Sequence, residues 1–519
     1  MKPSRRAWLV AWSLTLAGGA AGWAAFPPLG WWPMAMVSTA LLFAATRLLT
    51  PWRAFTVALG YGFVMFLPLL WWAKFAAGVV PWVILSAACA VLLGLAAPTW
   101  RYAAKLVQPK AWCLQPLLFA VLFTAADTFR GYFPFNGFPW VRFCFSQADS
   151  PLARLARLGG APLITFAAAL AGALLVSAGD QFVRRGRVTW AKGAVALALA
   201  AGIIILPAAI PLPTAAQSGT LLVAGVQGDV AVTEEGLFAH QREVLQNHVD
   251  GTLALAAAGV QPDVVLWPEN STDIDPETNQ EAWDAIDGAA QAIDAPILVG
   301  SIQYTETGQR YNLGVVWEPG VGITDRYAKQ HPAPWAEYIP MRSFSRLFSK
   351  KVDLIQHDML PGTKPAVLAL PVERLGRSVT LGDVICFEVA DDAVVTGSIA
   401  NGAEILVIQT NNASFGHTSE STQQLAMSRL RAIEYGRATV QVSTVGISAV
   451  IAPDGTVLEQ TGLFEAAQFT AELPLRTSKT PAVWLARPVA VGFMLVGLAL
   501  ALAGIGAGVV ARRRGSSRS

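Results

Sequence analysis

The sequence is short of charge. Only 14% of the 519 residues are Asp, Glu, Lys or Arg, whereas 54% are hydrophobic. Soluble domains carry about a quarter charged residues, so a wholly soluble protein is excluded. The net charge of +3 is small and scattered along the chain, which argues against a nucleic-acid-binding protein.

Cysteine is also scarce, and Cys386 is the only one between Thr220 and Thr480. Exported domains usually pair their cysteines in disulfides, and this stretch offers Cys386 no partner. A lone cysteine is by default a small buried hydrophobic side chain, so its neighbours in sequence must decide its role. The five histidines form no metal-ligand cluster. We therefore expect no metal site and no organic cofactor.

Long apolar runs are abundant. A bilayer core needs about 20 apolar residues in a helix, and eight segments qualify: 7–26, 29–49, 54–73, 79–99, 111–129, 161–179, 191–210 and 483–510. We read the first as an uncleaved anchor, because further spans follow closely. The pattern predicts a polytopic α-helical domain of seven spans at residues 1–210, a water-soluble domain at 220–478 and a closing transmembrane helix at 483–510.

Five clusters of Lys and Arg indicate the orientation of the chain. They occupy residues 2–6, 47–53, 101–110, 184–192 and 512–514. In an eight-span chain all five fall on the same side of the membrane, which the positive-inside rule identifies as the cytoplasm. Both termini are then cytoplasmic, and the water-soluble domain is exported.

Within that domain, short apolar strands alternate with amphipathic helices, which indicates a single α/β domain. The helix candidates are 236–257, 280–292 and 418–436. The strand candidates are Leu221–Gln227, Val264–Trp267, Ile297–Ser301, Leu313–Trp317, Ser378–Ile385, Ile405–Gln409, Val440–Ser443 and Ile447–Ile451.

Polar and reactive residues stand where three of these strands end. Glu269 follows the strand stopped by Pro268, Cys386 follows Ile385, and Asn412 lies just beyond the strand that reaches Gln409. In layered α/β domains ligands collect at the carboxyl ends of strands. A nucleophile, a base and the cation of Lys329 are the groups that covalent acyl transfer needs.

The order of short motifs is the most specific signal in the sequence. They are Val226-Gln227-Gly228, Trp267-Pro268-Glu269-Asn270, Tyr327-Ala328-Lys329-Gln330-His331, Pro334-Trp335-Ala336-Glu337-Tyr338, Gly382-Asp383-Val384-Ile385-Cys386-Phe387-Glu388 and Asn411-Asn412-Ala413-Ser414-Phe415-Gly416. This set resembles the nitrilase superfamily with its Glu-Lys-Cys triad. With the membrane spans around it, the chain resembles the apolipoprotein N-acyltransferase family.

The resemblance implies an exported αββα sandwich and a two-step reaction in the bacterial cytoplasmic membrane. Cys386 would take an acyl chain from a phospholipid as a thioester, and the α-amino group of a diacylated apolipoprotein would then accept it. By the same analogy Glu269 is the general base, Lys329 stabilises the oxyanion, and Glu337 is a second essential carboxylate. Glu388 is a supporting residue, and we expect a monomer in contact with membrane lipid.

The segment 341–351 combines apolar and basic residues. Phe344 and Phe348 share one helical face with Leu347, which suits a lid lying on lipid headgroups, although an ordinary amphipathic surface helix has the same pattern. We also expect Asn412 and Phe415 to contact substrate.

Two other functions fit parts of the sequence. One is a membrane-anchored amide hydrolase, since nitrilase-like sites commonly use water as the second nucleophile. The other is a non-catalytic envelope scaffold. Eight spans favour a lipid donor over a small soluble amide, and the intact triad disfavours the scaffold.

Overall fold

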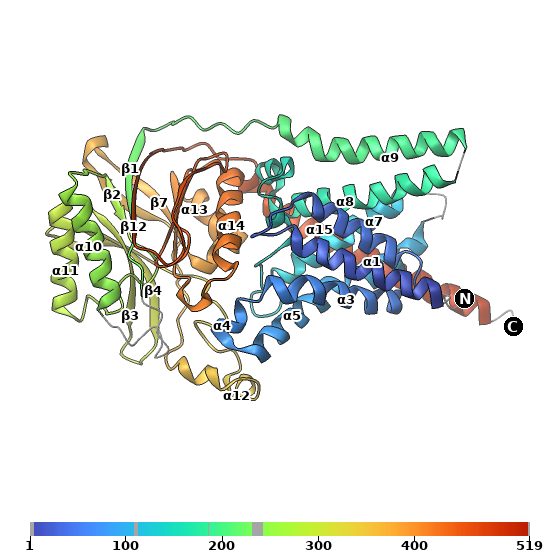
Figure 1. Cartoon of the computed structure of the whole chain (residues 1–519), viewed down its shortest axis with the longest axis horizontal. Helices are drawn as coiled ribbons and strands as arrows, with labels where there is room; N and C mark the ends of the chain where they lie inside the picture. The colour runs from blue at the N-terminus through green and yellow to red at the C-terminus, as the bar shows by residue number, and fades with distance from the viewer. Residues whose placement is uncertain (1–4, 108–112, 185, 231–241, 517–519) are drawn as a thin grey trace. The chain divides into compact units, whose positions relative to one another are not determined.

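The computed structural model describes residues 5–107, 113–184, 186–230 and 242–516 (Figure 1). The predicted basic residues Lys2, Lys110 and Arg185, and the start of the helix candidate 236–257, lie outside these ranges. The chain divides into two compact units. One is formed by Met1–Trp71, Val79–Pro211 and Trp484–Ser519, and the other by Trp72–Gly78 and Leu212–Val483.

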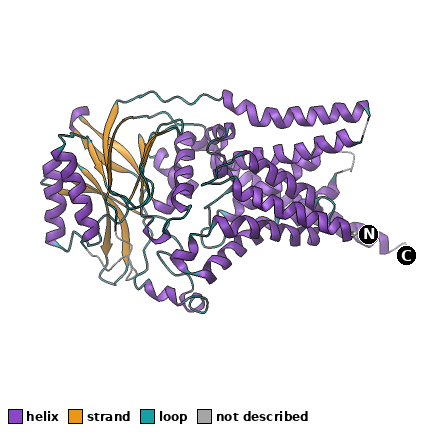
Figure 2. Ribbon diagram, in the orientation of Figure 1, coloured by secondary structure: helices purple, strands orange, loops and turns teal. Residues whose placement is uncertain are grey.

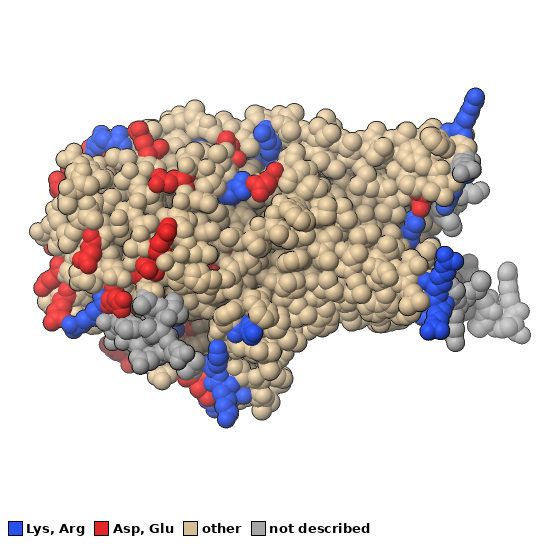
Figure 3. All heavy atoms as spheres, viewed as in Figure 1, with Lys and Arg blue, Asp and Glu red and all other residues tan. Residues whose placement is uncertain are grey.

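The first unit is helical. Its helices are α1 (Arg5–Ala24), α2 (Pro33–Thr46), α3 (Pro51–Leu69), α5 (Val79–Gly94), α6 (Ala96–Ala103), α7 (Leu114–Arg130), α8 (Ala156–Val183), α9 (Arg187–Ile205) and most of α15 (Ala482–Ser516). On the face shown in Figure 3 these helices carry almost no charge except at one end, where Lys and Arg gather.

Among the described residues, five helical segments are long and apolar enough to cross a membrane: Pro51–Leu69, Val79–Leu106, Pro151–Val183, Arg187–Ala209 and Ala482–Val510. They coincide with five of the eight predicted spans. The other three predicted spans are the helices α1, α2 and α7, which have 20, 14 and 17 residues. The protein is therefore built to lie in a membrane, and the count of eight stays a prediction.

A buried arginine organises the loop after α7. The Arg130 guanidinium donates hydrogen bonds to the carbonyls of Phe138, Trp140 and Val141 at 2.9–3.1 Å, and pairs with Asp127 at 3.1 Å. These bonds to Nη1 and Nη2, together with the ion pair, compensate for much of the cost of burying the charge.

The second unit contains two six-stranded sheets (Figure 2). The first has the order β12-β1-β2-β3-β4-β5 and the second β11-β10-β9-β8-β7-β6. The strands are β1 (Thr220–Gln227), β2 (Val264–Leu266), β3 (Ile297–Tyr304), β4 (Arg310–Glu318), β5 (Gly322–Ala328), β6 (Leu368–Val372), β7 (Arg377–Ile385), β8 (Ile405–Thr410), β9 (Thr439–Ser443), β10 (Ala449–Ile451), β11 (Val457–Gln460) and β12 (Ala467–Pro474).

The two sheets pack face to face over a core of Val, Leu and Ile side chains drawn from both, such as Leu266 and Val316 against Leu381 and Val407. The outer face of the first sheet is covered by α10 (Glu243–Ala257) and α11 (Gln280–Ile293), and that of the second by α13 (Asp392–Ala400) and α14 (Glu420–Tyr435). The predicted αββα sandwich is confirmed.

Candidate active site

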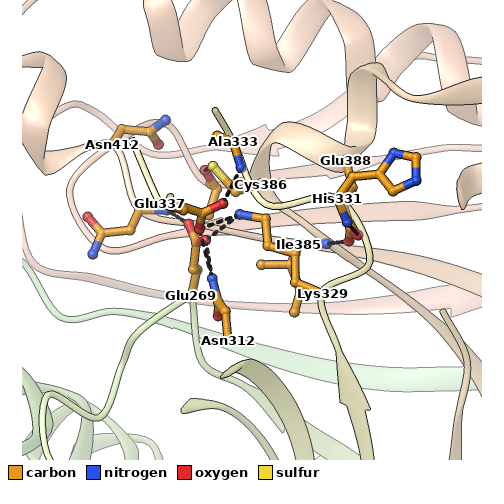
Figure 4. Close-up of polar contacts among 12 residues, drawn as sticks. Glu269, Asn312, Lys329, His331, Ala333, Glu337, Ile385, Cys386, Glu388 and Asn412 are labelled. Carbon is orange, nitrogen blue, oxygen red and sulfur yellow. Dashed lines mark hydrogen bonds and ion pairs between the residues drawn. The ribbon is translucent and has the colours of Figure 1, made fainter. Parts of the chain in front are cut away.

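The predicted triad residues come from both sheets. Glu269 lies just beyond β2 and Lys329 directly follows β5 in the first sheet, whereas Cys386 directly follows β7 in the second. Strands β7 and β8 are parallel neighbours, with Ile385 paired to Gln409, so the residue after β7 lies beside the end of β8. Figure 4 shows the side chains of Glu269, Lys329 and Cys386 converging.

Lys329 is held between two carboxylates. Its Nζ is 3.0 Å from Glu269 Oε1 and 2.8 Å from Glu337 Oε1. The side chains of Lys329 and Glu269 are only 1% and 4% exposed. Burial lowers the pKa of Lys329, but the neighbouring Glu269 and Glu337 charges outweigh it and hold that pKa well above the ordinary value. Lys329 is therefore a permanent cation.

The two carboxylates are fixed by further donors. Asn312 Nδ2 donates to Glu269 Oε1 at 2.7 Å and to Glu337 Oε1 at 3.3 Å. The backbone N–H of Asn411 donates to Glu269 Oε2 at 3.0 Å, and that of Ala333 to Glu337 Oε2 at 2.6 Å. Asn312 was not predicted from the sequence, although it stands directly before the predicted strand Leu313–Trp317, and its polar side chain at that point was a signal that could have found it.

Cys386 occupies a strained position. It is half-buried, opens a short 3-10 helix (Cys386–Ala390), and has a φ of +52°, in the left-handed region. Burial, and after it the negative charge of Glu269, raise the pKa of the Cys386 thiol well above its ordinary value, against the lowering effect of Lys329. The resting Cys386 side chain is therefore a protonated thiol.

Two side chains contact the Cys386 sulfur from the second sheet and its helix. Thr410 Oγ1 at the end of β8 is 3.5 Å from Sγ, and Gln424 Nε2 on α14 is 3.8 Å from it. Neither was predicted. Thr410 could have been inferred from its place at the end of the strand before Asn411, but the contact of Gln424 depends on how α14 packs.

The Glu388 carboxylate holds two backbone segments of the site together by hydrogen bonds. Its carboxylate accepts hydrogen bonds from the N–H groups of Gln330, His331 and Ile385 at 2.7–3.0 Å, and from Tyr327 Oη at 2.9 Å. Glu388 thus ties the segment after Lys329 to the residue before Cys386. Its predicted supporting role has this geometric basis.

Asn412 is buried in a polar network. It accepts a hydrogen bond from Ser443 Oγ at 2.6 Å and donates to Gln424 and Glu420 at 3.0 and 2.6 Å. Phe415 packs its ring at 5.1 Å from that of Trp72, in the segment Trp72–Gly78 that belongs to this unit.

The predicted helix over 341–351 is shorter in the structure, where α12 spans only Arg342–Ser345. Arg342 turns back to donate to the carbonyls of Val352 and Ile355, which closes the segment into a loop. Phe344 and Phe348 remain 54% and 43% exposed and contact each other at 5.1 Å.

Within the described residues, no three His, Cys, Asp or Glu side chains are grouped so as to hold a metal ion. The site consists of a cation, two carboxylates and a thiol.

Comparison with known proteins agrees with this architecture. Residues 18–174 match the apolipoprotein N-acyltransferase N-terminal domain, and residues 222–480 match the carbon-nitrogen hydrolase family. An apolipoprotein N-acyltransferase of Mycolicibacterium smegmatis is 38% identical over 95% of this chain and 85% of its own length. The chain belongs to the apolipoprotein N-acyltransferase family.

The chain is also similar to a second family member and, more distantly, to a solved structure. The apolipoprotein N-acyltransferase of Azotobacter vinelandii is 32% identical over 94% of both chains. Among solved structures, a Nesterenkonia AN1 amidase of the nitrilase superfamily aligns with 50% of this chain and 94% of its own, at 16% identity and a TM-score of 0.38.

Proposed function

We propose that this protein transfers an acyl chain from a phospholipid to the α-amino group of the N-terminal diacylglyceryl-cysteine of an apolipoprotein. Cys386 is the nucleophile, Glu269 the general base and Lys329 the oxyanion-stabilising cation. The observation that carries the proposal is the buried cluster of Lys329, Glu269 and Glu337 around the carboxyl ends of β2, β5 and β7. Family membership supports the choice of substrates.

In the first half-reaction Glu269 takes the proton from Cys386 Sγ as the sulfur attacks the ester carbonyl of the phospholipid. The charge that develops on the carbonyl oxygen is stabilised by Lys329, whose ammonium two carboxylates keep protonated. The tetrahedral intermediate collapses with loss of the ester C–O bond. Glu269 returns the proton to the leaving alkoxide, and a lysophospholipid departs from the thioester.

In the second half-reaction the apolipoprotein amine attacks the thioester carbonyl. An N–C bond forms, the C–S bond breaks, and the proton lost by the amine reaches the departing sulfur through Glu269. Glu337 accepts a hydrogen bond from Lys329 and keeps the ammonium in place through both halves. The product is an amide, and the Cys386 thiol is restored.

The long apolar helices favour the transferase over an amide hydrolase, because they place the enzyme where a phospholipid is the neighbouring acyl donor. The presence of all three triad residues, with Lys329 hydrogen-bonded to Glu269, disfavours a non-catalytic scaffold. We place the protein in the bacterial cytoplasmic membrane as a monomer, with both termini cytoplasmic and the sandwich on the outer side.

The loop at 341–351 supports a role in admitting lipid. It exposes Phe344 and Phe348 beside basic side chains, a composition that suits contact with a membrane interface. We assign it as the lid of the acyl-donor entrance.

Intact-mass spectrometry of the full chain, incubated with phospholipid in detergent, tests the reaction. We expect an added acyl mass on the wild type and on Cys113→Ala, whose cysteine is exposed and outside the site. Cys386→Ala should remain unmodified. A diacylated lipopeptide should discharge the acyl group much faster than water does.

Absence of any adduct on folded wild-type protein would overturn the thioester mechanism. Equal discharge by water and by lipopeptide would assign the protein as a hydrolase.

A further inference from the structure

The Cys386 sulfur has polar neighbours on the side formed by the second sheet and α14. Thr410 Oγ1 and Gln424 Nε2 lie 3.5 and 3.8 Å from Sγ, within the range of hydrogen bonds to sulfur. Lys329 is already engaged by two carboxylates. Cys386 must lose its proton in the proposed reaction, so these two contacts bear on the stability of its thiolate.

The orientation of the Gln424 amide is fixed by a chain of donors. The Gly446 N–H donates to Ser443 Oγ at 2.8 Å, Ser443 donates to Asn412 Oδ1 at 2.6 Å, and Asn412 Nδ2 donates to Gln424 Oε1 at 3.0 Å. Asn412 Nδ2 also donates to Glu420 Oε2 at 2.6 Å, so the NH₂ group of Asn412 faces two acceptors while its oxygen accepts from Ser443. The Gln424 oxygen therefore faces Asn412, and its NH₂ group faces Cys386.

The Thr410 hydroxyl has one proton and two acceptors within reach. It lies 2.9 Å from Gln424 Oε1 and 3.5 Å from Cys386 Sγ. While Cys386 is a thiol, the S–H can donate to Thr410 and the Thr410 hydroxyl to Gln424. Once the sulfur is a thiolate, the same hydroxyl can rotate and donate to it, because a hydroxyl both donates and accepts.

We propose that Thr410 and Gln424 form a donor pair that stabilises the Cys386 thiolate, both as the attacking nucleophile and as the leaving group when the thioester is cleaved. Both contact the reacting sulfur. The proton from Sγ goes to Glu269, and the pair keeps its own protons throughout. Asn412 and Ser443 are positioning residues that act through Gln424. This inference rests on the proposed role of Cys386 as the nucleophile.

The test measures ionisation of Cys386 without any acyl donor. Iodoacetamide forms an S–C bond with a thiolate and releases iodide, so its second-order rate at pH 8 reports the thiolate fraction. Peptide mass spectrometry of the full chain in detergent separates Cys386 from Cys89, Cys113 and Cys144. We expect Thr410→Val and Gln424→Met each to slow alkylation of Cys386 about tenfold, the usual effect of losing a hydrogen bond to a charged group.

Three controls separate this effect from a structural one. Thr410→Ser restores the hydroxyl and should react at nearly the wild-type rate. Thr439→Val changes a buried threonine on β9 whose hydroxyl donates to the backbone carbonyl of Arg437. Cys386 in this variant should be alkylated at the wild-type rate. Unfolding of a variant would speed up alkylation of Cys386 rather than slow it. Burial raises the pKa of the Cys386 thiol in the folded chain, so the thiol would ionise more readily in an unfolded chain.

Rates of Thr410→Val and Gln424→Met within about twofold of the wild type would overturn the donor pair, since one lost bond to a charge corresponds to about tenfold. That outcome would leave the acyltransferase function untouched. Conversely, failure of the wild type to load acyl from phospholipid would overturn the function while leaving the alkylation result standing.

Discussion

At the scale of single residues, the proposed mechanism requires a general base for Cys386. Burial and the charge of Glu269 raise the pKa of the thiol well above its ordinary value, so almost no free thiolate exists at neutral pH. The proton must leave as the sulfur attacks. In the proposed mechanism the two carboxylates around Lys329 have different roles: Glu269 receives that proton, and Glu337 holds the Lys329 ammonium in place.

Glu420 is a further buried carboxyl near Cys386. Burial raises its pKa to about 8, and its neighbour Glu269 adds to the effect, against the hydrogen bond from Asn412. A carboxyl whose pKa is higher in the folded than in the unfolded state binds more protons when folded. The free energy of unfolding therefore falls as pH rises from about 4.5 to 8, by about 1.4 kcal/mol per pH unit for one proton.

Glu420→Gln should remove this dependence. We expect the variant and the wild type to melt at similar temperatures at pH 5, and the variant to melt at a higher temperature at pH 8. Thermal denaturation of the full chain in one detergent measures both. Glu459→Gln, an exposed carboxyl on β11, is the matched control and should follow the wild type. A constant difference between Glu420→Gln and the wild type across this pH range would contradict the assignment.

The three residues predicted as a triad lie together in the structure, but the sequence did not predict the residues around them, for a physical reason. Glu269, Lys329 and Cys386 stand at strand ends within recognisable motifs. Asn312 and Gln424 reach the site only because β4 faces the ion cluster and α14 packs beside β8. Such contacts depend on packing between elements far apart in the sequence, which local patterns do not contain.

At the scale of elements, the eight strands predicted from the sequence are the eight inner strands of the two sheets. The four that were missed, β5, β6, β11 and β12, are the four sheet edges. Inner strands are buried on both faces and appear as continuous apolar runs. Edge strands carry polar and exposed residues, and three of the four residues of β11 are exposed. The continuous apolar run that identified the inner strands is therefore missing at the edges.

The proposed lid at residues 341–351 predicts that its exposed aromatic side chains matter for a lipid donor and not for a soluble one. Replacing both Phe344 and Phe348 with Ser should slow acyl loading from phospholipid in bilayers about tenfold or more, because two partly exposed aromatic side chains each contribute about 1.5–3 kcal/mol when buried in an apolar environment. Loading from a soluble short-chain ester should be unchanged, and so should the melting temperature.

Leu458→Ser changes an apolar side chain of β11 that is 58% exposed, and it serves as the matched control. Equal losses with the bilayer and the soluble donor would assign the two phenylalanines to the fold rather than to lipid entry.

At the scale of the whole molecule, the orientation in the membrane is the main prediction. One cysteine introduced at either Glu306 or Arg187, both exposed, marks the sandwich or the loop that ends where α9 begins, between two predicted spans. In spheroplasts carrying Cys113→Ser, a membrane-impermeant maleimide should label Glu306→Cys directly. It should label Arg187→Cys only after the membrane is permeabilised, since the Lys and Arg clusters place that loop in the cytoplasm. Labelling of Arg187→Cys in intact spheroplasts would invert the topology.

The pairing of β1 with β12 has a consequence for how such an enzyme can arise. Thr220 lies opposite Pro474, and the Gln217 N–H donates to Leu475 O at 2.9 Å, so the sandwich begins and ends at neighbouring points. A domain whose two ends lie close together can be inserted into another chain, because the insertion leaves the flanking segments of that chain near each other. Trp72, which contacts Phe415, lies outside the inserted stretch of sequence but belongs to the same compact unit as the sandwich.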